Sequence, residues 1–267
     1  MPSAFILHLP TTQSIPVIAS LPHSGLLVPK NIAENLQTPC QYYLPNQDWH
    51  LDKLYDFLPN LGITVLQAVY SRYVVDLNRS LQEPLFGNFW QSVIAEKTAF
   101  NTLIYRTLPL REEIEQRVEQ YYHPYHQKLQ HLLNKQIEQF GKVYLLDLHS
   151  FFGLIEDEIC LGNGNGSTCT EHFISIVETA FGSNGYQVVR NKVFSGGYIT
   201  QHYGRMPQVE ALQIEVRYPV YLNAAQLDDA SIPNWQVPEF DRAKHQFKTI
   251  FEQITDALLA GQLHRSQ

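Results

Sequence analysis

The sequence is poor in cysteine. Its 267 residues include three cysteines, Cys40, Cys160 and Cys169, and no CxxC pair. An odd number of cysteines without this spacing favours a reducing compartment over a disulfide framework, so we expect a cytoplasmic protein. No base for a cysteine nucleophile can be placed from the sequence, and we interpret Cys169 as a structural thiol.

Long apolar runs and an excess of positive charge are also missing. No apolar stretch approaches the roughly 18 residues of a membrane-spanning helix. The first ten residues lack the basic start and the apolar length of a secretion signal. The formal net charge is −7, which argues against nucleic acid or an anionic membrane as a partner. The oligomeric state cannot be predicted from these features.

Apolar and aromatic residues are plentiful enough for one large core. They make up 44% and 12% of the chain, and its length fits one large α/β domain. No internal repeat or low-complexity linker divides the sequence. We therefore predict a single catalytic domain over residues 1–267.

Expected strands alternate with expected helices along the chain. The strands are expected at 15–20, 62–70, 143–148, 185–191 and 209–217, with a further extended segment at 72–78. The helices are expected behind Asp48 as N-cap, at 111–140, at 170–181 and from 239 onward, and residues 195–204 are expected to form a loop. The strands are continuously apolar, which is typical of a sheet covered on both faces. This pattern predicts a three-layer α/β/α sandwich with a mixed, largely parallel central sheet.

Polar side chains accompany three of these strands. His23 follows the first strand, His149 follows the central strand, and Glu215 lies within the last one. Ligands bind beyond the carboxyl ends of the strands in such sheets. Two histidines and an additional carboxylate could hold a catalytic zinc ion, and a carboxylate that is not a ligand could act as a general base.

Each of these residues also has a structural interpretation. His23, in a Pro-His-Ser-Gly turn, could hydrogen-bond the backbone, and Glu215 could form a buried ion pair with Arg79 or Arg217. Asp147 is either a partner that orients a ligand histidine or a structural carboxylate. Taken together, the three strand ends favour a site over three independent structural roles.

Six segments of the chain together resemble one known family. They are "LPHSG", "QDWHLDKLYDF", "SRYVVDLNRS", "LLDLHS", "SGGYITQHYG" and "ALQIEV". Their order and their spread over roughly residues 17–222 resemble the N-formylglutamate amidohydrolase family. The resemblance implies a fold similar to that of the zinc carboxypeptidases and aspartoacylase. It also implies hydrolysis of N-formyl-L-glutamate to formate and glutamate, late in histidine degradation.

The resemblance further implies a metal site with Zn²⁺ or another divalent ion. His23 and His149 match the two metal-binding histidines. The third ligand of the superfamily is usually a Glu three residues after the first His, but Leu26 stands there in this chain. Asp48 is our candidate for the third ligand, with His50 and Asp52 as poorer alternatives.

The remaining roles follow from the same resemblance. Glu215 matches the general base, while Asn78 and Arg79 match the pair that holds a substrate carboxylate; Arg79 also has a possible catalytic role at the oxyanion. Further substrate contacts are expected from Arg72, Tyr198, Thr200, His202 and Arg205.

Residues 80–108 are irregular in pattern. Within them, residues 80–105 differ from the corresponding segment of the family, so this region is expected to shape the substrate pocket. The expected substrate is therefore a small acidic N-acyl amino acid, with N-formylglutamate first. Two alternatives stay open: hydrolysis of another N-acyl amino acid or short peptide-like amide, and binding of a small acidic ligand without turnover.

Overall fold

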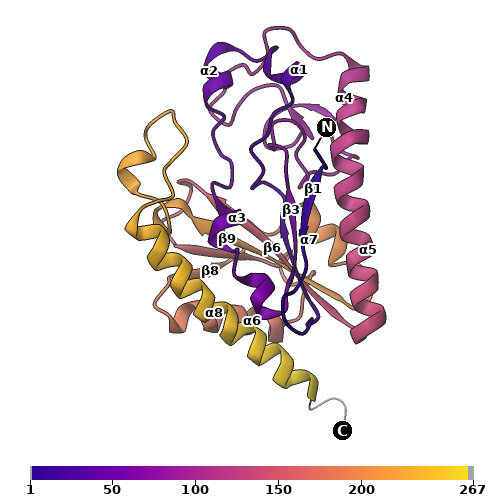
Figure 1. Cartoon of the computed structure of the whole chain (residues 1–267), viewed down its shortest axis with the longest axis vertical. Helices are drawn as coiled ribbons and strands as arrows, with labels where there is room; N and C mark the ends of the chain where they lie inside the picture. Colours follow the sequence, from indigo (N-terminus) through magenta and orange to yellow (C-terminus); the bar gives the residue numbers. More distant parts are fainter. Residues whose placement is uncertain (1, 264–267) are drawn as a thin grey trace.

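A seven-stranded sheet forms the centre of the computed structural model, which describes residues 2–263 (Figure 1). Its order is β1-β3-β2-β6-β9-β7-β8. The strands are β1 (Phe5–His8), β2 (Val17–Leu21), β3 (Thr64–Ala68), β6 (Val143–Phe151), β7 (Ile159–Gly162), β8 (Val188–Arg190) and β9 (Val209–Arg217). The four strands β3, β2, β6 and β9 are mutually parallel, whereas β1 and β7 pair antiparallel with β3 and β9. The mixed, largely parallel sheet is confirmed.

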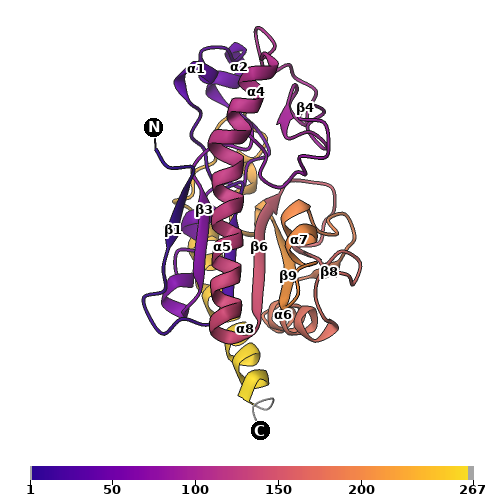
Figure 2. The ribbon, with the colours of Figure 1, turned by 90° about the vertical axis from the view of Figure 1, so that its right-hand side faces the viewer.

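Helices cover both faces of this sheet. On one face lie α4 (Arg111–Arg117), a π-helix (Val118–Tyr122) and α5 (His123–Phe140), which together form one long rod (Figure 2), and α7 (Tyr198–Tyr203). On the other face lie α3 (Leu51–Leu54), α6 (Glu171–Ser183) and α8 (Pro238–Leu263). Neighbouring residues of β6 therefore enter different cores: Leu145 packs in the cluster with α5, and Leu146 in the cluster with α8. Because both faces are buried, the strand is continuously apolar, and the three-layer sandwich is confirmed.

Shorter elements connect these layers. They are α1 (Lys30–Ala33), α2 (Thr38–Tyr42), the two-residue strands β4 (Phe86–Gly87) and β5 (Ile94–Ala95), and 3₁₀ turns at Leu58–Leu61, Tyr218–Val220 and Ala224–Gln226. Residues 80–108 are otherwise irregular, as expected. No helix within residues 2–263 has the length and apolarity needed to span a bilayer. Met1 and residues 264–267 lie outside the described part, so the single domain over 1–267 stays a prediction.

Several local predictions were wrong. Residues 72–78 form turns instead of an extended segment, and the expected loop 195–204 contains α7. The helix α7 forms because the side-chain oxygen of Asn78 accepts a hydrogen bond from the backbone N–H of Ile199 at 2.8 Å, which anchors its first turn. The glycines at 196 and 197 do lie in a loop, and the prediction fails only after them, where α7 begins at Tyr198.

Asp48 is also not the N-cap of the helix that follows it. The helix α3 begins at Leu51, and its N-cap position is occupied by His50 in the left-handed conformation, with φ at 58° and no capping bond from its side chain. The Asp48 carboxylate instead points away from the helix, toward His149. Asp48 is therefore a residue of the candidate site described below and not a helix cap.

Candidate active site

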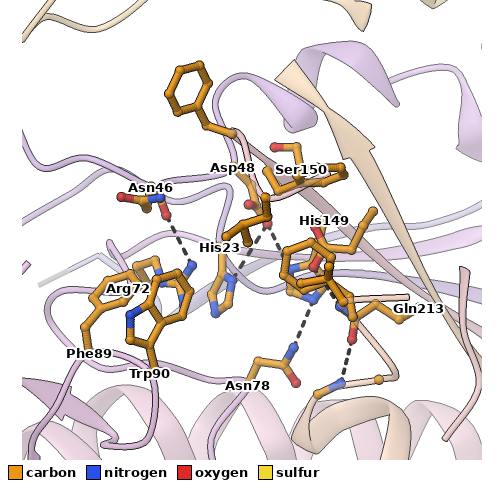
Figure 3. A pocket seen from close by; sticks show the side chains of 18 of the residues that line it. His23, Asn46, Asp48, Arg72, Asn78, Phe89, Trp90, His149, Ser150 and Gln213 are labelled. Atoms are coloured by element: carbon orange, nitrogen blue, oxygen red, sulfur yellow. Dashed lines mark hydrogen bonds and ion pairs between the residues drawn. The ribbon is translucent and has the colours of Figure 1, made fainter. Parts of the chain in front are cut away.

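Three buried side chains from distant segments converge at the carboxyl edge of the sheet. His23 follows β2, Asp48 precedes α3, and His149 lies on β6. One donor atom from each lies within 4.8 Å of the others. Figure 3 shows the three side chains pointing toward one another. Two imidazoles and one carboxylate form a nitrogen and oxygen donor set that suits a divalent metal ion.

The orientation of the two imidazole rings also fits a metal. Nδ1 of His149 lies 2.9 Å from Oδ2 of Asp48, and Nδ1 of His23 lies 3.7 Å from the same oxygen. The other ring nitrogen of each histidine faces an outer carboxylate, Asp76 at 2.7 Å for His23 and Asp147 at 3.2 Å for His149. Metal-binding histidines typically donate their second ring N–H to such a carboxylate. The residues present therefore fit a divalent ion held through the two Nδ1 atoms and Asp48.

The charges at this group favour a cation. Burial lowers the pKa of His23, which keeps its imidazole neutral and available as a ligand. Burial also disfavours the charged form of His149, but Asp147 and Asp48 outweigh it and raise its pKa well above the ordinary value. Burial opposes ionisation of Asp48, yet its hydrogen bond to His149 lowers its pKa. Two carboxylates around one imidazole thus create a site for positive charge.

Gly25, in the turn after His23, is required by a close backbone approach. A Cβ at this position would lie 2.5 Å from the carbonyl carbon of Val69. We expect Gly25→Ala to lower the free energy of unfolding by about 1–3 kcal/mol, which is the range for overpacked sites. Urea denaturation measures this change. Gly182→Ala, in helix α6 with nothing within 4 Å, is the control and should stabilise by about 0.4–1 kcal/mol. Equal effects of both substitutions would contradict this explanation.

Glu215 lies beside the three donors. It is on β9, directly opposite His149 in the register of the parallel pair β6–β9. Its Oε1 accepts a hydrogen bond from the side chain of Gln213 at 2.7 Å, and its buried Oε2 has no hydrogen-bond partner within residues 2–263. Burial raises its pKa to about 7. A carboxylate with one unpartnered oxygen and a raised pKa can accept a proton near neutral pH.

These groups lie in a cavity of about 400 Å³. Asn78 and Arg79 also line it, and its outer wall includes Phe89 and Trp90 from the irregular segment 80–108 (Figure 3). The presence of Phe89 and Trp90 in the cavity wall agrees with the prediction that residues 80–108 contribute to the pocket. Further apolar wall residues are Phe151, Phe152, Leu154, Val193 and Phe194.

The two arginines of the cavity differ in their contacts. Arg72 donates hydrogen bonds to the Asp76 carboxylate at 2.7 Å and to the backbone carbonyl of Asn46 at 3.1 Å, and its guanidinium lies over the Phe89 ring. Arg79 donates to the carbonyl of Asn78 at 3.3 Å, and its Nε lies 4.0 Å from Asp76. Arg79 is thus less engaged by the protein, and its guanidinium is more available than that of Arg72 to an anionic group in the cavity.

The residues expected from the 195–205 segment lie farther from the centre. Thr200 is fully buried and donates a hydrogen bond to Asp147 at 3.2 Å, so it supports a partner of His149 and does not line the cavity. Tyr198, His202 and Arg205 line a neighbouring hollow of about 640 Å³, which shares Asn78 and Arg79 with the first cavity. Their roles in substrate binding stay predictions.

Two buried residues were given no role by the sequence analysis. Asp76 bonds both His23 and Arg72, and Gln213 bonds Glu215. The sequence offered one signal for Gln213: it precedes Glu215 by two positions, and residues two apart in a strand share a face. Nothing local marks Asp76 as the partner of His23, because 53 positions separate them.

The fold and this group define a class of protein: a three-layer α/β/α protein with a buried His–Asp–His group suited to a divalent metal ion. The chain belongs to the N-formylglutamate amidohydrolase family, whose model matches residues 15–222. It is similar to N-formylglutamate deformylases of Pseudomonas putida, at 30% identity over 95% of this chain and 96% of that protein, and of Pseudomonas aeruginosa, at 32% identity over 78% and 83%. The structure is also similar to a crystal structure of an N-formylglutamate amidohydrolase from Ralstonia eutropha JMP134, with a TM-score of 0.82. The two chains are 24% identical, and the match covers 97% of this chain and 98% of that one, so they share the same fold.

Proposed function

We propose that this protein is a metal-dependent amidohydrolase that converts N-formyl-L-glutamate to formate and L-glutamate. The observation that carries the proposal is the position of Glu215, directly across the β6–β9 pair from His149 in the His23–Asp48–His149 group. The two Pseudomonas relatives, named as N-formylglutamate deformylases, support the choice of substrate.

The proposal also includes the identity of the metal ion, Zn²⁺, and a cytoplasmic location for the protein. His23, Asp48 and His149 would hold the ion, and two imidazoles with one carboxylate are a ligand set that Zn²⁺ accepts in catalytic sites. Bound there, a divalent ion supplies Lewis acidity, which lowers the pKa of water and polarises a carbonyl. The odd cysteine number favours a cytoplasmic location.

Glu215 performs the proton transfers of the proposed reaction. It takes a proton from the attacking water while the water oxygen bonds to the formyl carbon. It then returns this proton to the amide nitrogen as the C–N bond breaks, which releases glutamate with a free amino group and formic acid. The formic acid loses the second water proton to become formate, and the amino group of glutamate is protonated in solution. Its unpartnered Oε2 is the oxygen available for this exchange.

Arg79 binds a carboxylate of the substrate. A guanidinium can hold a carboxylate through two parallel hydrogen bonds, and Arg79 lines both the central cavity and the neighbouring hollow. Asn78 is less available, because its side-chain oxygen accepts from Ile199 and its nitrogen lies 3.1 Å from Nε2 of His149.

Arg79→Gln should therefore raise KM and lower kcat/KM for N-formylglutamate by about 10- to 100-fold, since a hydrogen bond to a charged group contributes roughly 1.5–3 kcal/mol. Initial rates over a range of substrate concentrations measure this change. Arg106→Gln, an exposed arginine of the same 80–108 segment, is the control and should behave as the wild type. An unchanged KM in Arg79→Gln would assign the carboxylate to another group.

Metal analysis combined with a substrate panel tests the proposal as a whole. Purified protein should bind about one divalent ion per chain and should hydrolyse N-formyl-L-glutamate in preference to N-acetyl-L-aspartate and a dipeptide. Preference for one of the other substrates would overturn the substrate assignment. Protein that takes up no metal and shows no turnover with added Zn²⁺ would be a binder of small acidic ligands.

A second candidate follows from the apolar mouth of the cavity. Trp90, Phe152, Leu154 and Val193 line the cavity and are exposed, with Leu154 62% and Trp90 48% accessible. Apolar surface at the mouth suits an N-acyl amino acid with an apolar acyl group or side chain. Faster turnover of N-formyl-L-methionine than of N-formyl-L-glutamate would favour this candidate.

A further inference from the structure

Gln213 is a buried polar residue beside the proposed base. It lies on β9, two residues before Glu215, so that both side chains project from the same face of the strand. Gln213 lines the central cavity together with Glu215. Figure 3 shows Gln213 and Asn78 at this cavity. A buried amide must find partners for both its N–H and its carbonyl, or it destabilises the fold.

Both ends of the Gln213 amide are engaged. Its Nε2 donates to Oε1 of Glu215 at 2.7 Å, and its Oε1 accepts from the backbone N–H of Gly197 at 2.5 Å. Gly197 itself is pressed against the site, because a Cβ there would lie 2.3 Å from the side-chain nitrogen of Asn78. Gln213 therefore connects the base to the turn that precedes α7.

This pair of bonds restricts how the Glu215 carboxylate can lie. A glutamate side chain has three rotatable bonds, and its buried carboxylate would turn toward any donor within reach. Because Gln213 holds Oε1, the carboxylate is fixed with Oε2 as the oxygen that has no hydrogen-bond partner in the described part of the chain. A reaction that needs a base within hydrogen-bond distance of water is sensitive to such a restraint.

We propose that Gln213 is a positioning residue that holds the Glu215 carboxylate in the orientation required for proton transfer. The inference rests on the proposed function of Glu215 as general base. The competing explanation is that Gln213 only anchors the turn at Gly197, in which case Glu215 would act normally without it.

Two substitutions of similar size separate the two explanations. Gln213→Met removes both hydrogen bonds, whereas Gln213→Glu keeps an oxygen for the Gly197 N–H but replaces the neutral amide donor by a second carboxyl group that competes with Glu215 for a proton. We expect both variants to lower kcat for N-formyl-L-glutamate about 10- to 100-fold, the usual effect of losing a partner that orients a reactive group. KM and the metal content should stay close to those of the wild type, since the hydrogen bonds of the Gln213 side chain in the described structure go to Glu215 and Gly197, and not to Arg79 or to His23, Asp48 and His149.

Gln201→Met is the matched control. Gln201 is a second glutamine that bonds the same turn, donating to the carbonyl of Gly196 at 2.7 Å, but no hydrogen bond links it to Glu215. Gln201→Met should therefore leave kcat near the wild-type value. A loss in Gln201→Met equal to that in Gln213→Met would assign the effect to the turn and overturn the proposal.

A double-mutant cycle adds a readout that anchoring alone would not produce. In the Glu215→Gln background, Gln213→Met should cause no further loss of kcat, because a residue that acts through Glu215 has nothing left to position. Additive losses would overturn the inference. A crystal structure of Gln213→Met should show the Glu215 carboxylate rotated away from its wild-type position, and an unmoved carboxylate would count against it.

The outcome can be distinguished from failure of the proposed function. Wild-type protein that does not hydrolyse N-formyl-L-glutamate with bound metal contradicts the function itself. Active wild-type protein with an equally active Gln213→Met variant contradicts only the positioning role.

Discussion

Glu215→Gln is expected to retain the metal and lose about 10²- to 10⁴-fold in kcat, which is the usual contribution of a general acid–base group. The amide is nearly the same size as the carboxylate, so packing against Gln213 and β6 is preserved. It cannot accept a proton from water, and for this reason the chemical step fails while the substrate still binds. Single-turnover kinetics together with metal analysis of the purified variant measure both parts of the prediction.

Glu210→Gln provides the control for this experiment. Glu210 lies on the same strand, five residues earlier, and accepts hydrogen bonds from the backbone and side chain of Thr170 while pairing with Lys142. Its substitution should lower the free energy of unfolding by about 1–3 kcal/mol and leave kcat unchanged. Near-normal kcat in Glu215→Gln would refute the assignment of Glu215 as the base.

Asp48→Ala is expected to abolish tight metal binding and, with it, activity. Its carboxylate lies between the two imidazoles, 2.9 Å from His149 and 3.7 Å from His23. The metal affinity should fall by more than the roughly 10- to 100-fold that follows loss of a partner of a ligand. Metal titration of the metal-free protein measures the change.

A stability measurement gives an independent readout of the same prediction. An ion that binds only the folded state raises the free energy of unfolding by RT ln(1 + [L]/Kd). Added Zn²⁺ should therefore raise the Tm of the wild type and leave that of Asp48→Ala unchanged.

Asp52→Ala is the matched control for Asp48→Ala. Asp52 was a poorer candidate for the third ligand, and its carboxylate lies 3.3 Å from the Lys53 ammonium, outside the three-residue group. Its loss should preserve the metal. Unchanged metal content in Asp48→Ala, or loss of metal in Asp52→Ala, would assign the third ligand elsewhere.

Local sequence pattern was sufficient to predict the layers of the fold. Leu145 and Leu146 point to opposite faces of β6, and both are buried, so the strand is apolar at every position. Such strands alternating with helices indicate a parallel sheet whose carboxyl ends share one edge. His23, His149 and Glu215 were predicted at this edge because each lies at or near the end of an apolar strand.

Asp48 was preferred over His50 and Asp52 from the family resemblance, but only the tertiary structure shows which of the three lies beside His23 and His149. The left-handed backbone at His50 accompanies a ring that lies 2.8 Å from the carbonyl of Pro233, and His50 is not part of the His23–Asp48–His149 group. Asp48 meets His149 across 101 positions of sequence. A contact between residues so far apart in the sequence cannot be predicted from the helix or strand periodicity of the chain.

The partners that orient the site were likewise decided only by the folded chain. Asp147 was left open as either a partner of a ligand histidine or a structural carboxylate, and its Oδ2 lies 3.2 Å from Nε2 of His149. Gln213 acts on a neighbour in its own strand, but its second bond reaches Gly197 from another segment. The sequence by itself determined which faces are apolar and which polar residues end the strands, because these follow from the two-residue and 3.6-residue periods of the backbone. Only the tertiary structure decided which polar groups meet, because hydrogen bonds and ion pairs require distances of about 3 Å between segments that no local period connects.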